Sequence, residues 1–135
     1  MRYRRFVALG DSTTEGLMDP LPDGSGFRGW ADRLAEILAA IEPDLRYANL
    51  AVRGKLARQV RETQLEPALA LKPDLVSLLA GLNDMLRRNV DVAGVVAEID
   101  GMVSRLREAG ADVILFTLQA NLNTAALRIA ASILH

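Results

Sequence analysis

The sequence predicts one α/β domain in which helices cover both faces of a parallel sheet of about four strands. Short apolar runs alternate with longer segments of helical periodicity along the 135 residues, with no repeat and no linker. Such alternation is typical of parallel strands joined by crossover helices. Half of the residues are hydrophobic but only 4% are aromatic. Leu, Ala and Val must therefore supply the core, as they do where helices pack on a buried parallel sheet.

The first part of the chain contains two predicted strands and one helix. Residues 4–9 form an apolar run that ends at Gly10, and we expect a buried strand there. After an irregular stretch at 17–29, apolar residues recur at helical spacing and stop before Pro43, which predicts the first helix. These residues are Trp30, Leu34, Ile37, Leu38 and Ile41. Residues 46–52 supply the second strand.

A second helix and a third strand follow. Leu56 and Val60 begin a helical stretch that Pro67 should kink or restart, because proline cannot donate the helical hydrogen bond. Residues 74–80 then form an apolar run that is short enough for a fully buried strand.

The last part of the chain contains the most strongly periodic helix, at 92–106, which Gly110 closes in the position expected after a helix C-terminus. The fourth strand follows at 112–118. From Asn121 to His135 the apolar residues fall on one helical face and predict a last amphipathic helix. The chain thus divides into an α/β domain at 1–118 and a C-terminal helix at 119–135, which packs on that domain or is exchanged between two copies.

The predicted strand order is 2-1-3-4, the flavodoxin-like order of doubly wound sheets. In this order the first and third strands are neighbours, and the connections leave them in opposite directions, which opens a crevice at the carboxyl ends of the strands. The loops there are Gly10–Gly16 and Gly81–Asp84, and they carry the most polar strand ends of the sequence. We therefore expect the functional site at this edge.

Composition and charge exclude several classes of function. Sixteen basic and seventeen acidic residues give a formal net charge of -1, so no strong field attracts nucleic acid or an anionic membrane surface. With no cysteine and one histidine, the chain shows no metal-ligand spacing, and we expect neither a metal nor a cofactor.

The apolar stretch after Arg2, Arg4 and Arg5 ends at Leu9, too early for an export signal or a membrane span. We expect a cytoplasmic location.

Three residues after strands have the chemistry of an acyl-transfer site. Ser12 can act as a nucleophile if a base and oxyanion donors assist it, although Ser12, Thr13 and Thr14 could equally cap a helix. The Asn83 amide can donate to an oxyanion beside Ser12. Gly54 lets backbone N–H groups approach a ligand closely, although an isolated loop asparagine or glycine has no such meaning on its own.

Taken together, G-D-S-T-T-E-G at 10–16, N-L-A-V-R-G-K at 49–55 and G-L-N-D at 81–84 resemble three blocks of the SGNH, or GDSL-type, hydrolases. This is a family of esterases, lipases and acylhydrolases on a flavodoxin-like fold. The resemblance covers residues 6–118 and implies that Ser12 attacks carboxylic esters to form an acyl-enzyme. It also implies three oxyanion donors, which are the N–H of Ser12, the N–H of Gly54 and the amide of Asn83.

The family's last block, D-x-x-H, follows a fifth strand and supplies the histidine base with its aspartate. This chain lacks the block: its only histidine is His135, the final residue, and Ser132 stands where the aspartate would be. We expect a shortened member without the fifth strand and with weak or lost turnover. The donors and substrate binding alone can retain roughly 10³ to 10⁴-fold rate enhancement in serine hydrolases.

The missing strand would also leave the strand at 112–118 with an open edge. We therefore predict that two copies associate, through that edge or by exchange of the tail helix.

Two other functions fit the same residues. A flavodoxin-like protein could hold a phosphate or flavin with Ser12, Thr13 and Thr14 at a helix N-terminus. Trp30 and Tyr47 lie in a predicted helix and strand, which argues against a flavin site. A scaffold of the same fold that has lost catalysis and only self-associates is the third possibility.

Overall fold

The computed structural model describes residues 2–16, 29–121 and 126–134. Its core is a sheet in the order β2-β1-β3-β4-β5. The strands are β1 (Arg5–Gly10), β2 (Arg46–Asn49), β3 (Leu75–Leu79), β4 (Asp112–Asn121) and β5 (Ala126–Leu134). The first four are parallel, and β5 runs antiparallel to β4. The predicted α/β class and the parallel order 2-1-3-4 are therefore confirmed.

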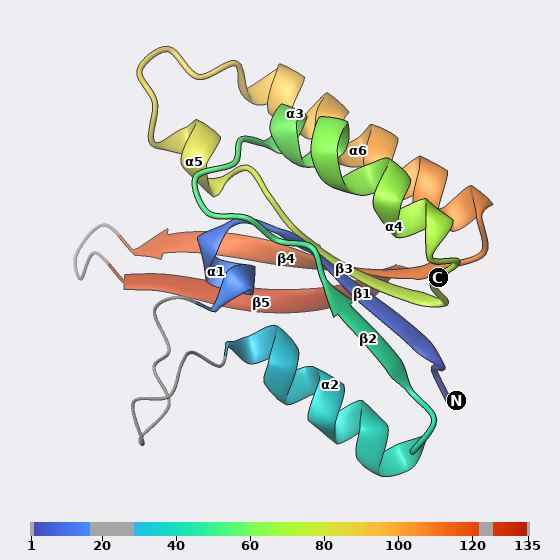
Figure 1. Ribbon diagram of the computed structural model, residues 1–135. Helices are drawn as coiled ribbons and strands as arrows, with labels where there is room; N and C mark the ends of the chain where they lie inside the picture. The colour runs from blue at the N-terminus through green and yellow to red at the C-terminus, as the bar shows by residue number, and fades with distance from the viewer. Residues whose placement is uncertain (1, 17–28, 122–125, 135) are drawn as a thin grey trace.

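Helices cover both faces of this sheet (Figure 1). On one face lies α2 (Trp30–Ile41), and on the other lie α3 (Ala57–Val60), the π-helical turn η1 (Arg61–Leu65), α4 (Glu66–Ala70) and α6 (Val92–Glu108). Two short helices, α1 (Ser12–Glu15) and α5 (Leu82–Met85), follow β1 and β3 closely. Among the described residues, no helix combines the length and apolar character needed to cross a membrane.

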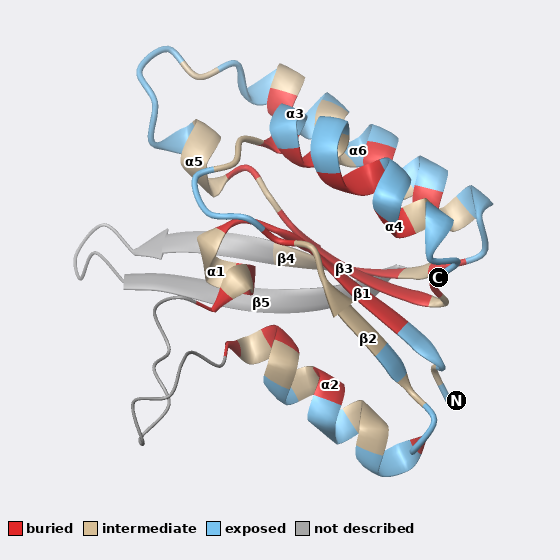
Figure 2. Cartoon of the chain, in the orientation of Figure 1, coloured by how far each residue is buried: buried red, intermediate tan, exposed pale blue. Residues whose placement is uncertain are grey.

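Alternate residues of the strands pack against the two helical layers, because successive side chains of a strand point to opposite faces. In β1, Phe6 and Ala8 belong to the core under α2. Val7 and Leu9 belong to the core on the other face. That second core takes Val60, Leu65, Ala68, Met102 and Leu106 from the helices. Figure 2 shows the resulting burial of β1, of β3 and of the helical sides that face the sheet.

One helix contains a proline without breaking. The backbone remains in right-handed helical conformation from α3 through η1 into α4, with Pro67 near the start of α4. In regular α geometry the Pro67 ring would meet the carbonyl of Thr63. The wider π turn of η1 lies just before Pro67 and offers a way to relieve that contact. The predicted kink is thus a π turn inside a continuous helix.

The predicted C-terminal helix is wrong over the residues that the structure describes. Ala126–Leu134 forms β5, which pairs with β4 from Asn121↔Ala126 to Val113↔Leu134. The apolar residues Leu127, Ile129 and Ile133 fit a period of two as well as a helical period. The unpaired backbone groups at the edge of β4 favour the extended form, because a strand there completes the hydrogen bonds of the sheet.

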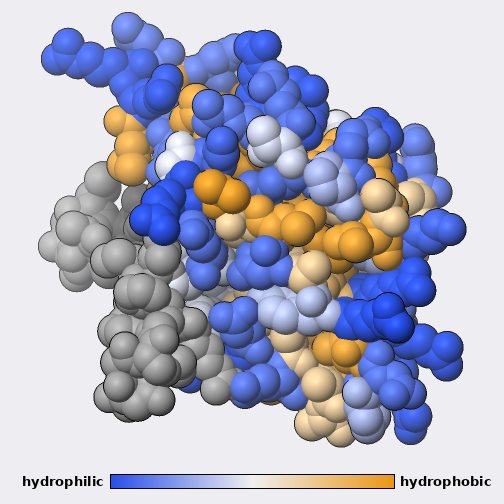
Figure 3. Space-filling model, in the orientation of Figure 1, coloured by the Kyte–Doolittle hydropathy of each residue, from blue (hydrophilic) through white to orange (hydrophobic). Residues whose placement is uncertain are grey.

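The fifth strand also removes the open edge that we expected at residues 112–118. Because β5 covers β4 within the same chain, pairing of two copies through β4 loses its basis. The sheet ends instead at β2 and β5. Beside β2, the large apolar residues Val52 and Leu71 are exposed, and Figure 3 shows hydrophobic atoms gathered on the side of the molecule where β2 runs.

The fold leaves no room for a side chain at Gly10. Its φ is +153°, and a Cβ atom there would lie 2.4 Å from the carbonyl oxygen of Leu79 in β3. We predict that Gly10→Ala lowers the free energy of unfolding by about 3 kcal/mol, from backbone strain and overpacking together. Urea denaturation measures this change.

Gly101 is the matched control, because it lies inside α6 and a Cβ atom there would meet nothing within 4 Å. Gly101→Ala should raise the free energy of unfolding by roughly 0.5–1 kcal/mol, since alanine favours the helix. Equal urea midpoints for Gly10→Ala and the wild type would contradict the close approach of β1 and β3.

Candidate active site

Three polar loops meet at the carboxyl edge of the sheet. In the register of the strands, Gly10 lies opposite Leu79, and Ala8 lies opposite Asn49. The segments that follow β1, β2 and β3 therefore leave the sheet at the same edge. These segments carry the predicted site residues Ser12, Gly54 and Asn83.

The loop after β1 becomes α1 at once. Asp11 is the N-cap of this short helix, and its Oδ1 accepts a hydrogen bond from the Thr13 N–H at 3.1 Å. Ser12 is half-buried at the first helical position, and its hydroxyl has no hydrogen bond with another described residue. Since Asp11 already serves as the cap, helix capping does not account for Ser12.

The loop after β2 is attached to α1. The Arg53 N–H donates to Glu15 Oε2 at 2.6 Å, and the Arg53 guanidinium lies 3.6 Å from Glu15 Oε1. Asn49 strengthens the attachment, because its Nδ2 donates to the Thr14 carbonyl at 2.9 Å. Gly54 follows Arg53 with a φ of +76° and is exposed, and a Cβ atom on it would meet nothing within 4 Å. Its backbone is therefore open to a ligand.

The loop after β3 is attached to the loop after β2. Asn83 is half-buried in α5, and its Nδ2 donates to the Lys55 carbonyl at 3.0 Å. The neighbouring Asp84 accepts the Ala57 N–H through Oδ2 at 2.9 Å. A primary amide has two N–H donors, so Asn83 keeps one for another acceptor.

Hydrogen bonds thus connect the three loops in series, from Glu15 through Arg53 and Lys55 to Asn83. His135, the only histidine of the sequence, lies outside the described residues. In the part of the chain that the structure describes, no group of three or more His, Cys, Asp or Glu residues could hold a metal ion.

Sequence reasoning missed the residues that hold the loops together. Glu15 and Asn49 gave no signal beyond their place in the matched blocks. Gln64 of η1 is only 2% exposed, and its side chain bonds both backbone groups of Gly10. One sequence signal was available for Gln64: a polar residue falls between Val60 and Ala68, at four-residue spacing on the apolar side of a predicted helix.

A cavity of about 380 Å³ lies beside the candidate site. It is lined by Leu56, Arg58, Asp84, Arg87, Arg88, Asn89, Val90, Asp91, Gly94, Val95 and Glu98. Asp84 links the cavity to the loop that carries Asn83. Ser12, Gly54 and Asn83 do not line it.

A family model described as the GDSL-like lipase/acylhydrolase family matches residues 8–131. An acetylxylan esterase of Geobacillus stearothermophilus is 31% identical over 90 residues, a match that covers 62% of this chain and 41% of that protein. The chain therefore spans less than half the length of this relative.

Solved structures agree on the fold. TesA aligns with a TM-score of 0.66 and 28% identity, over 83% of this chain and 59% of TesA. The esterase AlinE4 of the SGNH-hydrolase family aligns with a TM-score of 0.70 and 22% identity, over 93% of this chain and 65% of that one. A catalytic mutant of Axe2, an acetylxylan esterase from Geobacillus stearothermophilus, aligns with a TM-score of 0.68 and 23% identity, over 83% of this chain and 58% of that one.

The position of Asp11 raises the pKa of its carboxyl. The residue is 1% exposed, and its Oδ2 has no hydrogen-bond partner among the described residues. Burial raises the pKa of the Asp11 carboxyl above its ordinary value, the Thr13 hydrogen bonds oppose that shift, and the Asp84 carboxylate adds to it. The folded protein therefore holds this proton more tightly than the unfolded chain does.

We predict that Asp11→Asn flattens the pH dependence of stability. A raised folded-state pKa makes the contribution of Asp11 fall as the pH rises from its ordinary pKa through its raised one. Asparagine keeps an oxygen for the Thr13 N–H but does not titrate in this range. In urea unfolding across that pH interval, the free energy of unfolding of the variant should increase relative to that of the wild type as the pH rises. Two parallel curves, whatever their constant offset, would mean that burial leaves Asp11 unshifted.

Proposed function

Since the chain belongs to the GDSL-like lipase/acylhydrolase family, we propose that it hydrolyses carboxylic esters through an acyl-enzyme at Ser12. One observation carries this proposal: hydrogen bonds between the loops hold Ser12, Gly54 and Asn83 at one edge of the sheet. Two further observations support it: the Ser12 hydroxyl has no hydrogen bond with another described residue, and the backbone of Gly54 is open.

In the first step, Ser12 Oγ gives its proton to water or to the imidazole of His135 and attacks the ester carbonyl carbon. The carbonyl oxygen becomes negative and accepts hydrogen bonds from the Ser12 N–H, the Gly54 N–H and the second Asn83 N–H. The Ser12 N–H is suited to this role because the first N–H groups of a helix have no partner within the helix. The alcohol then leaves, and water hydrolyses the acyl-serine.

The group that accepts the Ser12 proton limits the rate of this mechanism. The nearby carboxylates of Glu15 and Asp84 already accept backbone N–H groups, and His135 is the only histidine of the chain. We therefore propose weak turnover that favours activated esters, because a leaving group such as p-nitrophenolate departs without needing a proton. The similarity to an acetylxylan esterase makes acetyl esters the first substrates to test.

We also propose a cytoplasmic location, on the sequence argument alone, and association of two copies. With β4 covered by β5, the β2 edge and the exposed apolar Val52 and Leu71 beside it are the surface that favours pairing. A single-chain mass in light scattering at micromolar concentration would exclude this association.

The nucleophile is tested by hydrolysis of p-nitrophenyl acetate. Ser12→Ala should reduce the rate far below that of the wild type, to the residual rate that the donors and substrate binding alone sustain, because no attacking oxygen remains. Ser104→Ala is the matched control: Ser104 is exposed on α6, and its variant should keep the wild-type rate. His135→Ala in the same assay tests the remaining candidate base, and an unchanged rate would remove His135 from the mechanism.

Equal rates for Ser12→Ala and the wild type would end the assignment of Ser12. A wild-type protein that is itself inactive, and that a fluorophosphonate leaves unmodified, would favour the scaffold without catalysis.

A further inference from the structure

We infer that Gln64 is a positioning residue for Ser12, because its side-chain amide fixes the backbone of Gly10, where the turn to Ser12 begins. The inference rests on the proposed role of Ser12. Gln64 itself is buried in η1, on the helical layer that packs against β1, and does not take part in the chemistry.

The contact is a pair of equal hydrogen bonds. Gln64 Oε1 accepts the Gly10 N–H at 2.9 Å, and Gln64 Nε2 donates to the Gly10 carbonyl at 2.9 Å. These two groups belong to the peptide planes on either side of the Gly10 Cα atom. A side chain that holds both planes fixes the φ and the ψ of Gly10 together.

Gly10 needs this restraint because of its own conformation. Its φ of +153° and the Leu79 carbonyl, 2.4 Å from the place of a Cβ atom, exclude any larger residue. Glycine, however, has no side chain to limit rotation about its backbone bonds. Gln64 supplies that limit from another element, and the Val52 N–H adds a longer bond to the same carbonyl at 3.2 Å.

A rotation at Gly10 would move the whole start of α1. Asp11, the cap, and Ser12, the first helical residue, follow directly along the chain. Shifting a reacting group by about 1 Å can cost roughly 100-fold in rate. The effect of losing the Gln64 contact should therefore fall mainly on kcat, since the geometry of attack changes more than the binding of the ester.

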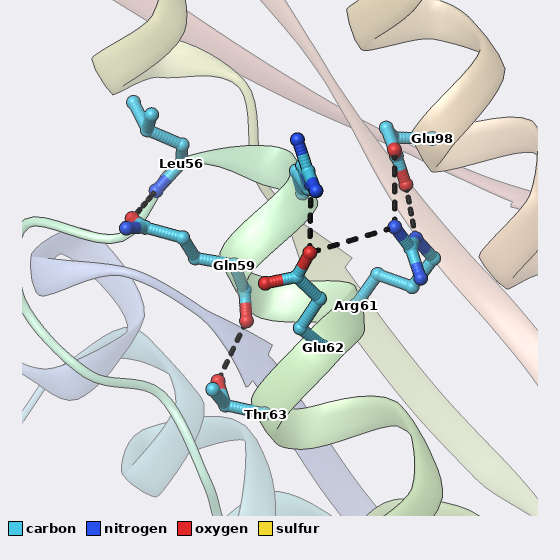
Figure 4. Close-up of polar contacts among 7 residues, drawn as sticks. Leu56, Gln59, Arg61, Glu62, Thr63 and Glu98 are labelled. Atoms are coloured by element: carbon cyan, nitrogen blue, oxygen red, sulfur yellow. Dashed lines mark hydrogen bonds and ion pairs between the residues drawn. The ribbon is translucent and has the colours of Figure 1, made fainter.

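Polar contacts on the outer side hold the helix that carries Gln64 (Figure 4). Arg61 forms an ion pair with Glu98 of α6, and Thr63 Oγ1 donates to the Gln59 carbonyl at 2.6 Å. These contacts fasten η1 to α6 and to α3. Because the inner side of η1 is buried through Gln64 and Leu65, the amide has a rigid support.

The test compares Gln64→Leu and Gln64→Glu with Gln59→Glu. Gln59 is the matched control, because it is exposed on the same helix and uses only its Oε1, which accepts the Leu56 N–H at 2.9 Å. A carboxylate can make that bond equally well. At Gln64, in contrast, a carboxylate cannot donate to the Gly10 carbonyl, and leucine can make neither bond.

With p-nitrophenyl acetate at neutral pH, both Gln64 variants should lose about 100-fold in kcat, with KM nearly unchanged. Gln59→Glu should equal the wild type. In Gln64→Glu the kcat relative to the wild type should recover as the pH falls, because burial raises the pKa of the introduced carboxyl and its protonated form both donates and accepts. A merely destabilised variant would show no such recovery.

Hydrogen exchange of the Gly10 amide gives a readout without turnover. Exchange should speed up at least about tenfold in Gln64→Leu and stay unchanged in Gln59→Glu. If Gln64→Leu does not fold, the kcat of Gln64→Glu and its recovery at low pH carry the test, because a carboxylate at position 64 still accepts the Gly10 N–H and loses only the bond to the Gly10 carbonyl.

Unchanged Gly10 exchange in Gln64→Leu, or wild-type kcat in a Gln64 variant while Ser12→Ala is strongly impaired, would overturn the inference. If Ser12→Ala equals the wild type, the proposed function has failed, and the exchange measurement alone then decides whether Gln64 fixes Gly10.

Discussion

The parallel pairing of β1 with β3 is the constraint on which the rest of the structure depends. Gly10 lies opposite Leu79 in this pairing, so closely that only glycine fits. The pairing places the ends of both strands at one edge of the sheet. It also brings the turn that carries Ser12 and the turn that carries Asn83 together, although about seventy residues separate them along the chain.

The sheet brings the loops near one another, but polar side chains fix how they lie. Glu15 holds the loop of Gly54 through Arg53, and Asn83 holds it from the other side through Lys55. The half-buried bond from Asn83 stabilises a single arrangement, because breaking it leaves a polar group without a partner, whereas the bond between Arg53 and Glu15 is exposed. The proposed function requires the backbone and side-chain donors of these loops to be arranged before any ligand binds, because stabilisation of an oxyanion depends on donors that are already in place.

Periodicity and turn residues were sufficient to predict most of the fold. The strands at 4–9 and 74–80 and the helix at 92–106 are confirmed with small changes at their ends, because each is a strongly patterned segment that the tertiary structure does not override. The tail failed because its pattern fits a helix and a strand equally, and the free edge of β4 decided between them. The sequence could mark Gln64 only as a polar residue on an apolar helical side, since its hydrogen bonds to Gly10 depend on a π turn and on tertiary packing.

The most direct measurement is a crystal structure of the protein after treatment with a fluorophosphonate ester. We predict a phosphorus atom bonded to Ser12 Oγ. One phosphonyl oxygen should lie roughly 3 Å from the backbone nitrogens of Ser12 and Gly54 and from Asn83 Nδ2. A label on another residue, or a phosphonyl oxygen that points away from these three donors, would contradict the proposal that the three loops form one acyl-transfer site.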